Sequence, residues 1–151
     1  MLYLFIHLIF QYRFWWGYFS ADRFHHAKEE DVLFKALVDN GMPKDNSPVA
    51  AMLMEHDQGR SFVRAMETAV TEAQTGSQDS YQAIADNALG YAALLHDHIA
   101  KEDDILYPLA ERVLPEEMRS SILRGYQAAE AQTAPDFGVH YLAIVTMYEQ
   151  E

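Results

Sequence analysis

One stretch of this chain occurs twice, and it limits the folds that the chain can adopt. The segment "HHAKEEDVLFKAL", residues 25–37, returns as "HIAKEDDILYPLA", residues 98–110. Each copy embeds charged residues in an otherwise apolar helical pattern. A buried carboxylate is costly unless a positive charge or a hydrogen bond compensates it. The repeat therefore predicts two core-facing helices that carry polar groups inward, toward something that balances their charge.

Helical patterns cover the chain, and no stretch is typical of a hairpin or an alternating strand. The first helix is predicted to end near Asp39, because Gly41 in "NG" suits a helix C-terminus. Ser47 is predicted to cap a second helix whose first residue is Pro48, a favoured pairing. The polar loop "TGSQDS" follows that helix.

The third helix is predicted to start at Asp79 or Ser80 and to run through the second copy to about Val113, bending at Pro108. Pro115 opens a shorter segment, "PEEMRSSILRGYQAAEA", and a last helical stretch, "VHYLAIVTMYEQE", closes the chain. Short loops between long helices favour an up-and-down antiparallel bundle. We therefore expect an all-α fold.

Composition narrows the partners and the kind of metal site. Eleven Lys and Arg against 23 Asp and Glu give a formal charge of −12, which argues against nucleic acid and anionic lipid. The chain has no Cys, which excludes disulfides, iron–sulfur clusters and thiolate metal sites. Any metal must therefore be held by nitrogen and oxygen atoms.

The first nineteen residues, "MLYLFIHLIFQYRFWWGYF", are apolar and aromatic. However, the polar residues His7, Gln11 and Arg13 argue against a membrane span. The segment also lacks the basic start and the cleavage site of a signal peptide. We expect a cytoplasmic protein of one domain, residues 1–151.

Five residues are candidate metal ligands. Within each copy a His and a Glu stand four residues apart, His25 with Glu29 and His98 with Glu102. On a helix such side chains lie about 40° apart and one turn along, so both can reach one ion. His56 adds an imidazole from the apolar stripe of the second helix. This nitrogen and oxygen set suits iron, manganese or zinc.

Each of these features also has a simpler interpretation. A lone His-x-x-x-Glu is usually a solvated salt bridge, and a lone core His is usually hydrogen-bonded. Repetition on two apolar stripes favours ligands instead. His26 and Glu30 have the same spacing but lie about 100° around the helix from His25 and Glu29. This position favours placement on the surface. The alternative is that the pair accepts a hydrogen bond from a ligating His. His7, His96 and His140 have no matching partner and are predicted to be structural or surface residues.

Three motifs in order, "ADRFHHAKEEDVLF", "AMLMEHDQGRSFVRAM" and "LLHDHIAKEDDILYPLAERVL", resemble those of hemerythrin-like, HHE cation-binding domains. The resemblance covers about residues 18–115 and leaves 116–151 as a C-terminal helical extension. It implies a four-helix bundle that holds a non-haem di-iron centre. The ligands it implies are His25, Glu29, His56, His98 and Glu102, with bridging carboxylates and terminal imidazoles.

The chain departs from that family at its start. Members usually begin with a helix that bears a further His, and the upstream candidate here, His7, lies eighteen residues before His25. On one helix that separation is about 27 Å, beyond any shared ion. We expect a bundle that lacks its first helix, with partial metal loading. Its bare aromatic face at Phe14, Trp15, Tyr18 and Phe19 favours a homo-oligomer.

Three functions remain open at this point. The first, which we favour, is reversible binding of O2 or another small ligand, or sensing of iron, oxygen or nitric oxide. In that case the protein is not an enzyme. The second is a di-iron oxidoreductase that acts on O2 or peroxide. The third is a non-catalytic helical interaction module with a decayed metal site. No nucleophilic triad, phosphate loop or dinucleotide fingerprint points to another enzyme class.

Overall fold

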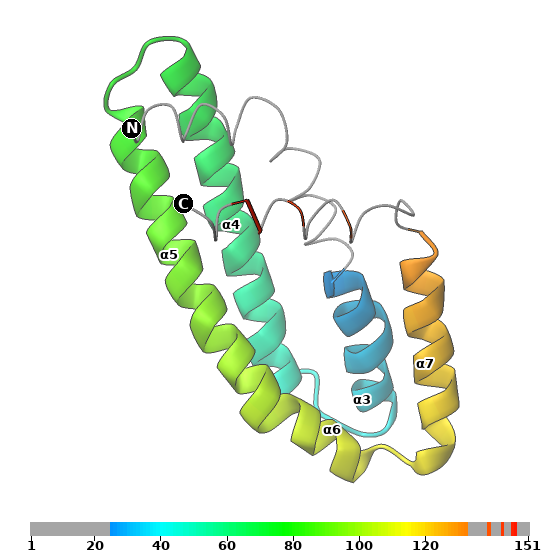
Figure 1. Cartoon of the computed structure of the whole chain (residues 1–151). Helices are drawn as coiled ribbons and strands as arrows, with labels where there is room; N and C mark the ends of the chain where they lie inside the picture. Colours follow the sequence, from blue (N-terminus) through cyan, green and yellow to red (C-terminus); the bar gives the residue numbers. More distant parts are fainter. Residues whose placement is uncertain (1–24, 133–138, 140–142, 144–145, 148–151) are drawn as a thin grey trace. The chain divides into compact units, whose positions relative to one another are not determined.

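The structure is a computed structural model that describes residues 25–132, 139, 143 and 146–147 (Figure 1). Every regular element within these residues is a helix, and they include no strand. The predicted all-α helical bundle is therefore confirmed. The chain divides into two compact units. We call residues 36–115 the central unit, and residues 1–35 with 116–151 the flanking unit.

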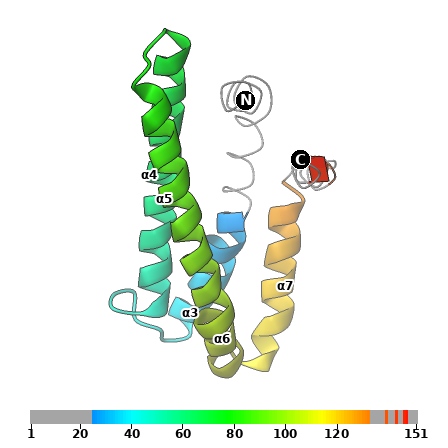
Figure 2. The ribbon, with the colours of Figure 1, turned by 60° about the vertical axis from the view of Figure 1, so that its left-hand side comes forward.

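The central unit is built on a long helical hairpin. Helices α4 (Pro48–Gln74) and α5 (Ser80–Lys101) lie side by side and run in opposite directions (Figures 1 and 2). α5 continues into the π-helix η2 (Glu102–Leu106) and then into α6 (Tyr107–Val113). The end of α3 (Lys35–Asp39) also belongs to this unit.

Apolar side chains from these helices form the core of the central unit. Its most deeply buried members are Leu37, Val49, Met52, Val63, Met66, Ala69, Ile84 and Leu106. Helices α4 and α5 approach closely at Gly90 of α5, where an added Cβ would lie 2.7 Å from Cε1 of Phe62 in α4. Within this apolar interior the buried polar residues stand out, and they include His56, His98 and Glu102.

Local signals set the helix ends as predicted. The Ser47 hydroxyl accepts a hydrogen bond of 3.2 Å from the backbone N–H of Ala50, and Pro48 is the first residue of α4. α3 ends at Asp39, and Gly41 has a positive φ of 98°, which glycine adopts without steric cost. α5 begins at Ser80 after Asp79, as expected.

A π-helical stretch lies just before Pro108, where the sequence predicts a bend. η2 ends at Leu106, two residues before Pro108, which has no N–H to donate to a carbonyl in the preceding turn. The helix nevertheless continues to Val113, as predicted. The helical hydrogen-bond register therefore changes shortly before the proline.

The flanking unit pairs the first motif with a later helix. Residues 25–28 are helical and lead into the π-helix η1 (Glu29–Phe34), and α7 spans Glu116–Glu130. η1 and α7 pack closely, because a Cβ on Gly125 would lie 2.7 Å from Cγ1 of Val32. Lys28 Nζ also donates to Glu130 Oε1 over 3.2 Å.

Several expectations concern residues outside the described part of the chain. These are the absent first helix, the surroundings of His7 and His140, the N-terminal aromatic face, and most of the last helical stretch. Among the helices that are described, none combines the length and the apolar character that a membrane crossing requires.

Candidate metal centre

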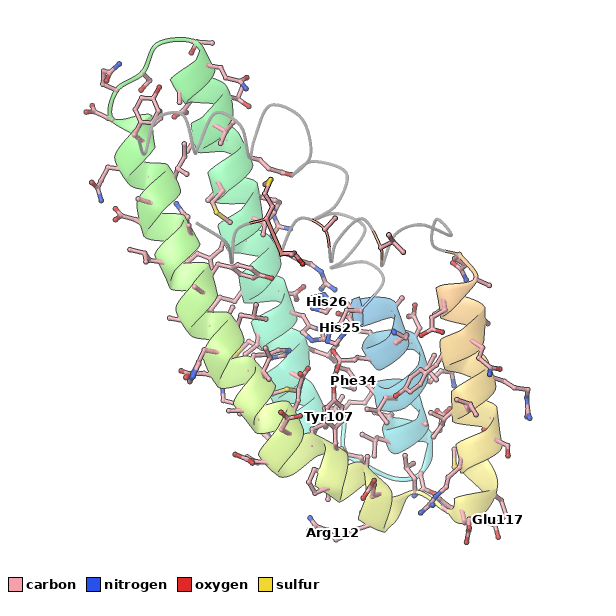
Figure 3. The ribbon with its side chains drawn as sticks, in the orientation of Figure 1. His25, His26, Phe34, Tyr107, Arg112 and Glu117 are labelled. Atoms are coloured by element: carbon pink, nitrogen blue, oxygen red, sulfur yellow. The ribbon has the colours of Figure 1, made fainter. Side chains whose placement is uncertain are left out.

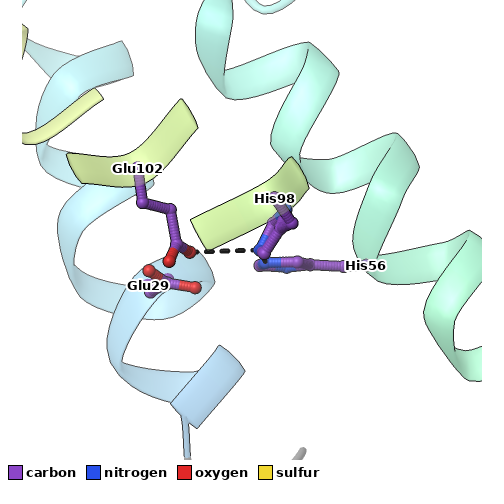
Figure 4. A group of neighbouring side chains, drawn as sticks. All are labelled: Glu29, His56, His98 and Glu102. Carbon is purple, nitrogen blue, oxygen red and sulfur yellow. Dashed lines mark hydrogen bonds and ion pairs between the residues drawn. The ribbon is translucent and has the colours of Figure 1, made fainter. Parts of the chain in front are cut away.

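Three of the predicted ligands meet inside the central unit. His56 comes from α4, His98 from the end of α5, and Glu102 from the start of η2. Their exposed fractions are 2%, 5% and 4%. Figure 4 shows the two imidazoles and the Glu102 carboxylate converging, with dashed lines through His98. The long hairpin thus brings residues 42 positions apart to one point.

The distances between their donor atoms suit a shared cation. His56 Nε2 and His98 Nε2 are 3.2 Å apart, and His98 Nε2 and Glu102 Oε1 are 3.1 Å apart. Metal–nitrogen and metal–oxygen bonds of about 2.0–2.2 Å place neighbouring ligand atoms roughly 3.0–3.5 Å from each other. One proton cannot serve both contacts of His98 Nε2, whereas one cation can. The side chains present therefore fit a metal ion.

The first copy of the motif forms the same kind of pair in the flanking unit. His25 Nε2 and Glu29 Oε2 are 3.3 Å apart, and Glu29 is buried while the His25 side chain is 52% exposed. Next to them, His26 Nδ1 lies 4.0 Å from Glu30 Oε1, and both side chains are partly buried, not on the open surface. Figure 3 shows His25 and His26 at the start of their helix.

The sequence as a whole matches one family model. The hemerythrin HHE cation-binding domain model matches residues 11–110, which include both motif copies and His56. The chain belongs to this family. Neither the curated proteins nor the solved structures give a match. Membership of a cation-binding family and a buried cluster of His and Glu together indicate that this hemerythrin-like domain holds a metal cation.

A residue beside the cluster was not identified from the sequence. His98 Nδ1–H donates to Glu55 Oε2 over 2.9 Å, and Lys101 Nζ donates to Glu55 Oε1. Burial raises the pKa of Glu55, but its hydrogen bonds to Lys101 and His98 and the positive charge of Lys101 outweigh burial and lower that pKa. Glu55 is thus ionised. Its position next to His56 in "MEHD" was the one signal available in the sequence.

The contact with Glu55 decides which nitrogen of His98 faces the cluster. A neutral imidazole carries its proton on one nitrogen and a lone pair on the other. With Nδ1–H donating to Glu55, the lone pair lies on Nε2, the atom nearest His56 and Glu102. Metal-bound histidines commonly show such a hydrogen bond from their second nitrogen.

Tyr126 of α7 lies near the first motif in the flanking unit. Burial raises the pKa of its phenol, and the negative charge of Glu29 raises that pKa further. The phenol therefore remains protonated through neutral pH. No sequence motif indicates this hydroxyl, because α7 carries no part of the repeat.

One further expectation can be compared with the structure. His96 is exposed and pairs with Asp97 over 3.3 Å, so the expected surface placement is confirmed. Close to His56, a Cβ on Gly59 would lie 3.3 Å from Cε2 of Tyr91, so the missing side chain allows α4 and α5 to pack together.

Proposed function

We propose that this hemerythrin-like domain binds non-haem iron and uses it to bind O2 or another small ligand, or to sense iron, oxygen or nitric oxide. The observation that carries the proposal is the convergence of His56 Nε2, His98 Nε2 and Glu102 Oε1 in a buried interior. Imidazole and carboxylate ligands suit iron, and the same atoms accept manganese and zinc.

His25 and Glu29 are proposed as further metal ligands, as a second His–Glu pair. Both copies of the repeat place the same two residue types four positions apart. The His–Glu contacts are also alike, at 3.3 Å in the first copy and 3.1 Å in the second. The two pairs and His56 would supply three imidazoles and two carboxylates to a dinuclear centre, and water or another ligand would fill the remaining coordination positions.

Each side chain has a definite task in this proposal. The imidazoles direct a nitrogen lone pair at the ion, and the carboxylates balance part of its charge. Burial of His56, His98 and Glu102 keeps bulk water from their donor atoms. When bound, iron with an open coordination position supplies affinity for diatomic ligands and the capacity for one-electron chemistry.

The test is an iron count on two matched double variants. Purified full-length protein is loaded with Fe²⁺ without oxygen and desalted, and iron per chain is measured. His56→Ala with Glu102→Ala should remove the bound iron. His96→Ala with Asp103→Ala removes an exposed His and an exposed acid from the same region and should retain it. Negligible iron in the unmodified protein, or equal iron in both double variants, would refute the proposal.

The same preparation separates the competing functions. Spectral changes on adding O2, nitric oxide or azide, without turnover, support ligand binding or sensing. Sustained consumption of peroxide by the iron-loaded protein, against a metal-free control, would assign an oxidoreductase. Protein that never retains stoichiometric iron would be a helical interaction module.

A further inference from the structure

Glu55 lies between a candidate ligand and a lysine, and both of its oxygens are engaged. Oε2 accepts the Nδ1–H of His98, and Oε1 accepts a hydrogen bond from Lys101 Nζ. The Glu55 side chain is 10% exposed, whereas that of Lys101 is 41% exposed. The result is a chain of contacts that runs from the protein surface through Glu55 to His98.

We propose that Glu55 and Lys101 are positioning residues for the metal centre: Glu55 holds His98 with Nε2 directed at the ion, and Lys101 holds Glu55. This inference rests on the proposed function, because it assigns His98 as a ligand. It goes beyond that function by adding two residues that set metal affinity without touching the metal.

The geometry separates Glu55 from the ligating carboxylates. Glu102 contacts His98 at Nε2, and Glu55 contacts the other ring nitrogen, Nδ1. Glu55 therefore acts on the ring orientation and on the basicity of Nε2. A carboxylate that accepts the second N–H of a ligating imidazole is a common outer partner, and its loss typically weakens metal affinity about 10–100-fold.

Lys101 prevents Glu55 from adopting another arrangement. A carboxylate next to an ion-binding cluster can rotate toward the cation, which would release His98. The ammonium group of Lys101 attracts Glu55 Oε1 and leaves Oε2 for the imidazole. Lys101 lies one residue before the candidate ligand Glu102, so the helix that supplies a ligand also supplies the residue that orients its neighbour.

The repeat itself offers matched controls. Lys28 stands in the first copy where Lys101 stands in the second, and it pairs with Glu130 of α7 over 3.2 Å. Glu130 is about half exposed and is not a candidate ligand. Lys28→Met and Glu130→Gln therefore remove equivalent charges from a lysine–glutamate pair that does not orient His98.

The experiment measures Zn²⁺ affinity of the full-length protein by competition with a chelator. Glu55→Gln should weaken zinc binding about 10–100-fold, and Lys101→Met by up to about tenfold. Lys101→Arg should restore the affinity, because it keeps the cation. The controls Lys28→Met and Glu130→Gln should bind zinc like the unmodified protein.

A second readout separates positioning from a general loss of structure. In zinc-loaded, nitrogen-15-labelled protein, NMR should detect the protected Nδ1–H of His98. This resonance should persist in Lys101→Arg and exchange with water in Lys101→Met. The metal-free melting temperature should be the same in both Lys101 variants, and this comparison stands if Glu55→Gln fails to fold.

Two results would overturn the inference. If Glu55→Gln and Lys101→Met bind zinc as tightly as the two controls, the pair does not position His98, while the proposed metal centre stands. If the unmodified protein binds neither zinc nor iron, the proposed function fails, and the positioning role fails with it.

Discussion

Both ring nitrogens of His98 are engaged, and this makes it the central residue of the cluster. Nδ1 donates to Glu55, and Nε2 lies within 3.2 Å of His56 and 3.1 Å of Glu102. All four side chains lie in or at the edge of the buried interior. Polar groups gathered there cost folding free energy, and a bound cation would offset that cost.

Glu102→Gln tests this balance at a single residue. The amide keeps the size of the side chain but removes the negative charge that a metal requires. Without metal, we expect a melting temperature equal to or above that of the unmodified protein, because a buried charge has been removed. The stabilisation by added Zn²⁺ should fall sharply. At a free concentration one hundred times the dissociation constant it amounts to about 2.7 kcal/mol in the unmodified protein.

Thermal unfolding with and without Zn²⁺ measures both effects. Asp103→Asn is the control, because Asp103 is the exposed neighbour of Glu102 and carries the same charge. It should keep the full stabilisation by zinc. A Glu102→Gln protein that zinc stabilises as strongly as the control would show that Glu102 does not bind the ion.

The sequence identified residues that lie on repeated or apolar stripes. His98 and Glu102 followed from the repeat, and His56 from its helical stripe, and the structure brings these three together. Glu55 did not follow, because its contact with His98 depends on how α4 and α5 align along their length. That alignment is a property of tertiary packing, for example at Gly90 and Phe62, and no local pattern specifies it.

The ends of the helices could be predicted from the sequence, whereas the π-helical segments inside them could not. Ser47, Pro48 and Gly41 mark their helix ends through local hydrogen bonds or backbone angles, so the sequence suffices. The π-helices η1 and η2 begin at Glu29 and Glu102, the equivalent residues of the two copies. An α-helical periodicity does not reveal such a change in hydrogen-bond register.

Proline alone does not account for the two π-helices. Pro108 follows η2, but the equivalent position after η1 is Lys35, and both copies nevertheless widen. π-helical turns occur frequently at functional sites, which agrees with their start at the two candidate carboxylate ligands.

The start of α4 provides a prediction at the scale of the helix. Ser47→Ala removes the hydroxyl that accepts the N–H of Ala50, and should lower the free energy of unfolding by about 1 kcal/mol. Ser61→Ala lies inside the same helix, on an exposed position where its hydroxyl donates to the carbonyl of Asp57. It should be neutral or slightly stabilising, because Ala favours the helix interior. Urea unfolding compares the two, and equal losses would contradict the role of the cap.

At the scale of the whole molecule, we propose that both copies of the repeat supply metal ligands. The chain has a formal charge of −12, so a cluster of buried carboxylates adds to an already acidic molecule, and bound cations would relieve that repulsion. The match to the hemerythrin HHE cation-binding domain spans both copies. The claim requires Glu29 and Glu102 to be equivalent in function, not only in sequence.

Iron retained per chain in Glu29→Gln and in Glu102→Gln, after loading with Fe²⁺ without oxygen, tests that claim most directly. Asp31→Asn and Asp103→Asn serve as exposed neighbouring controls with the same charge change. We predict that both ligand variants lose most of the iron that the unmodified protein retains, and that both controls keep it. Full retention of iron by Glu29→Gln, together with its loss in Glu102→Gln, would contradict the proposal that both copies supply metal ligands.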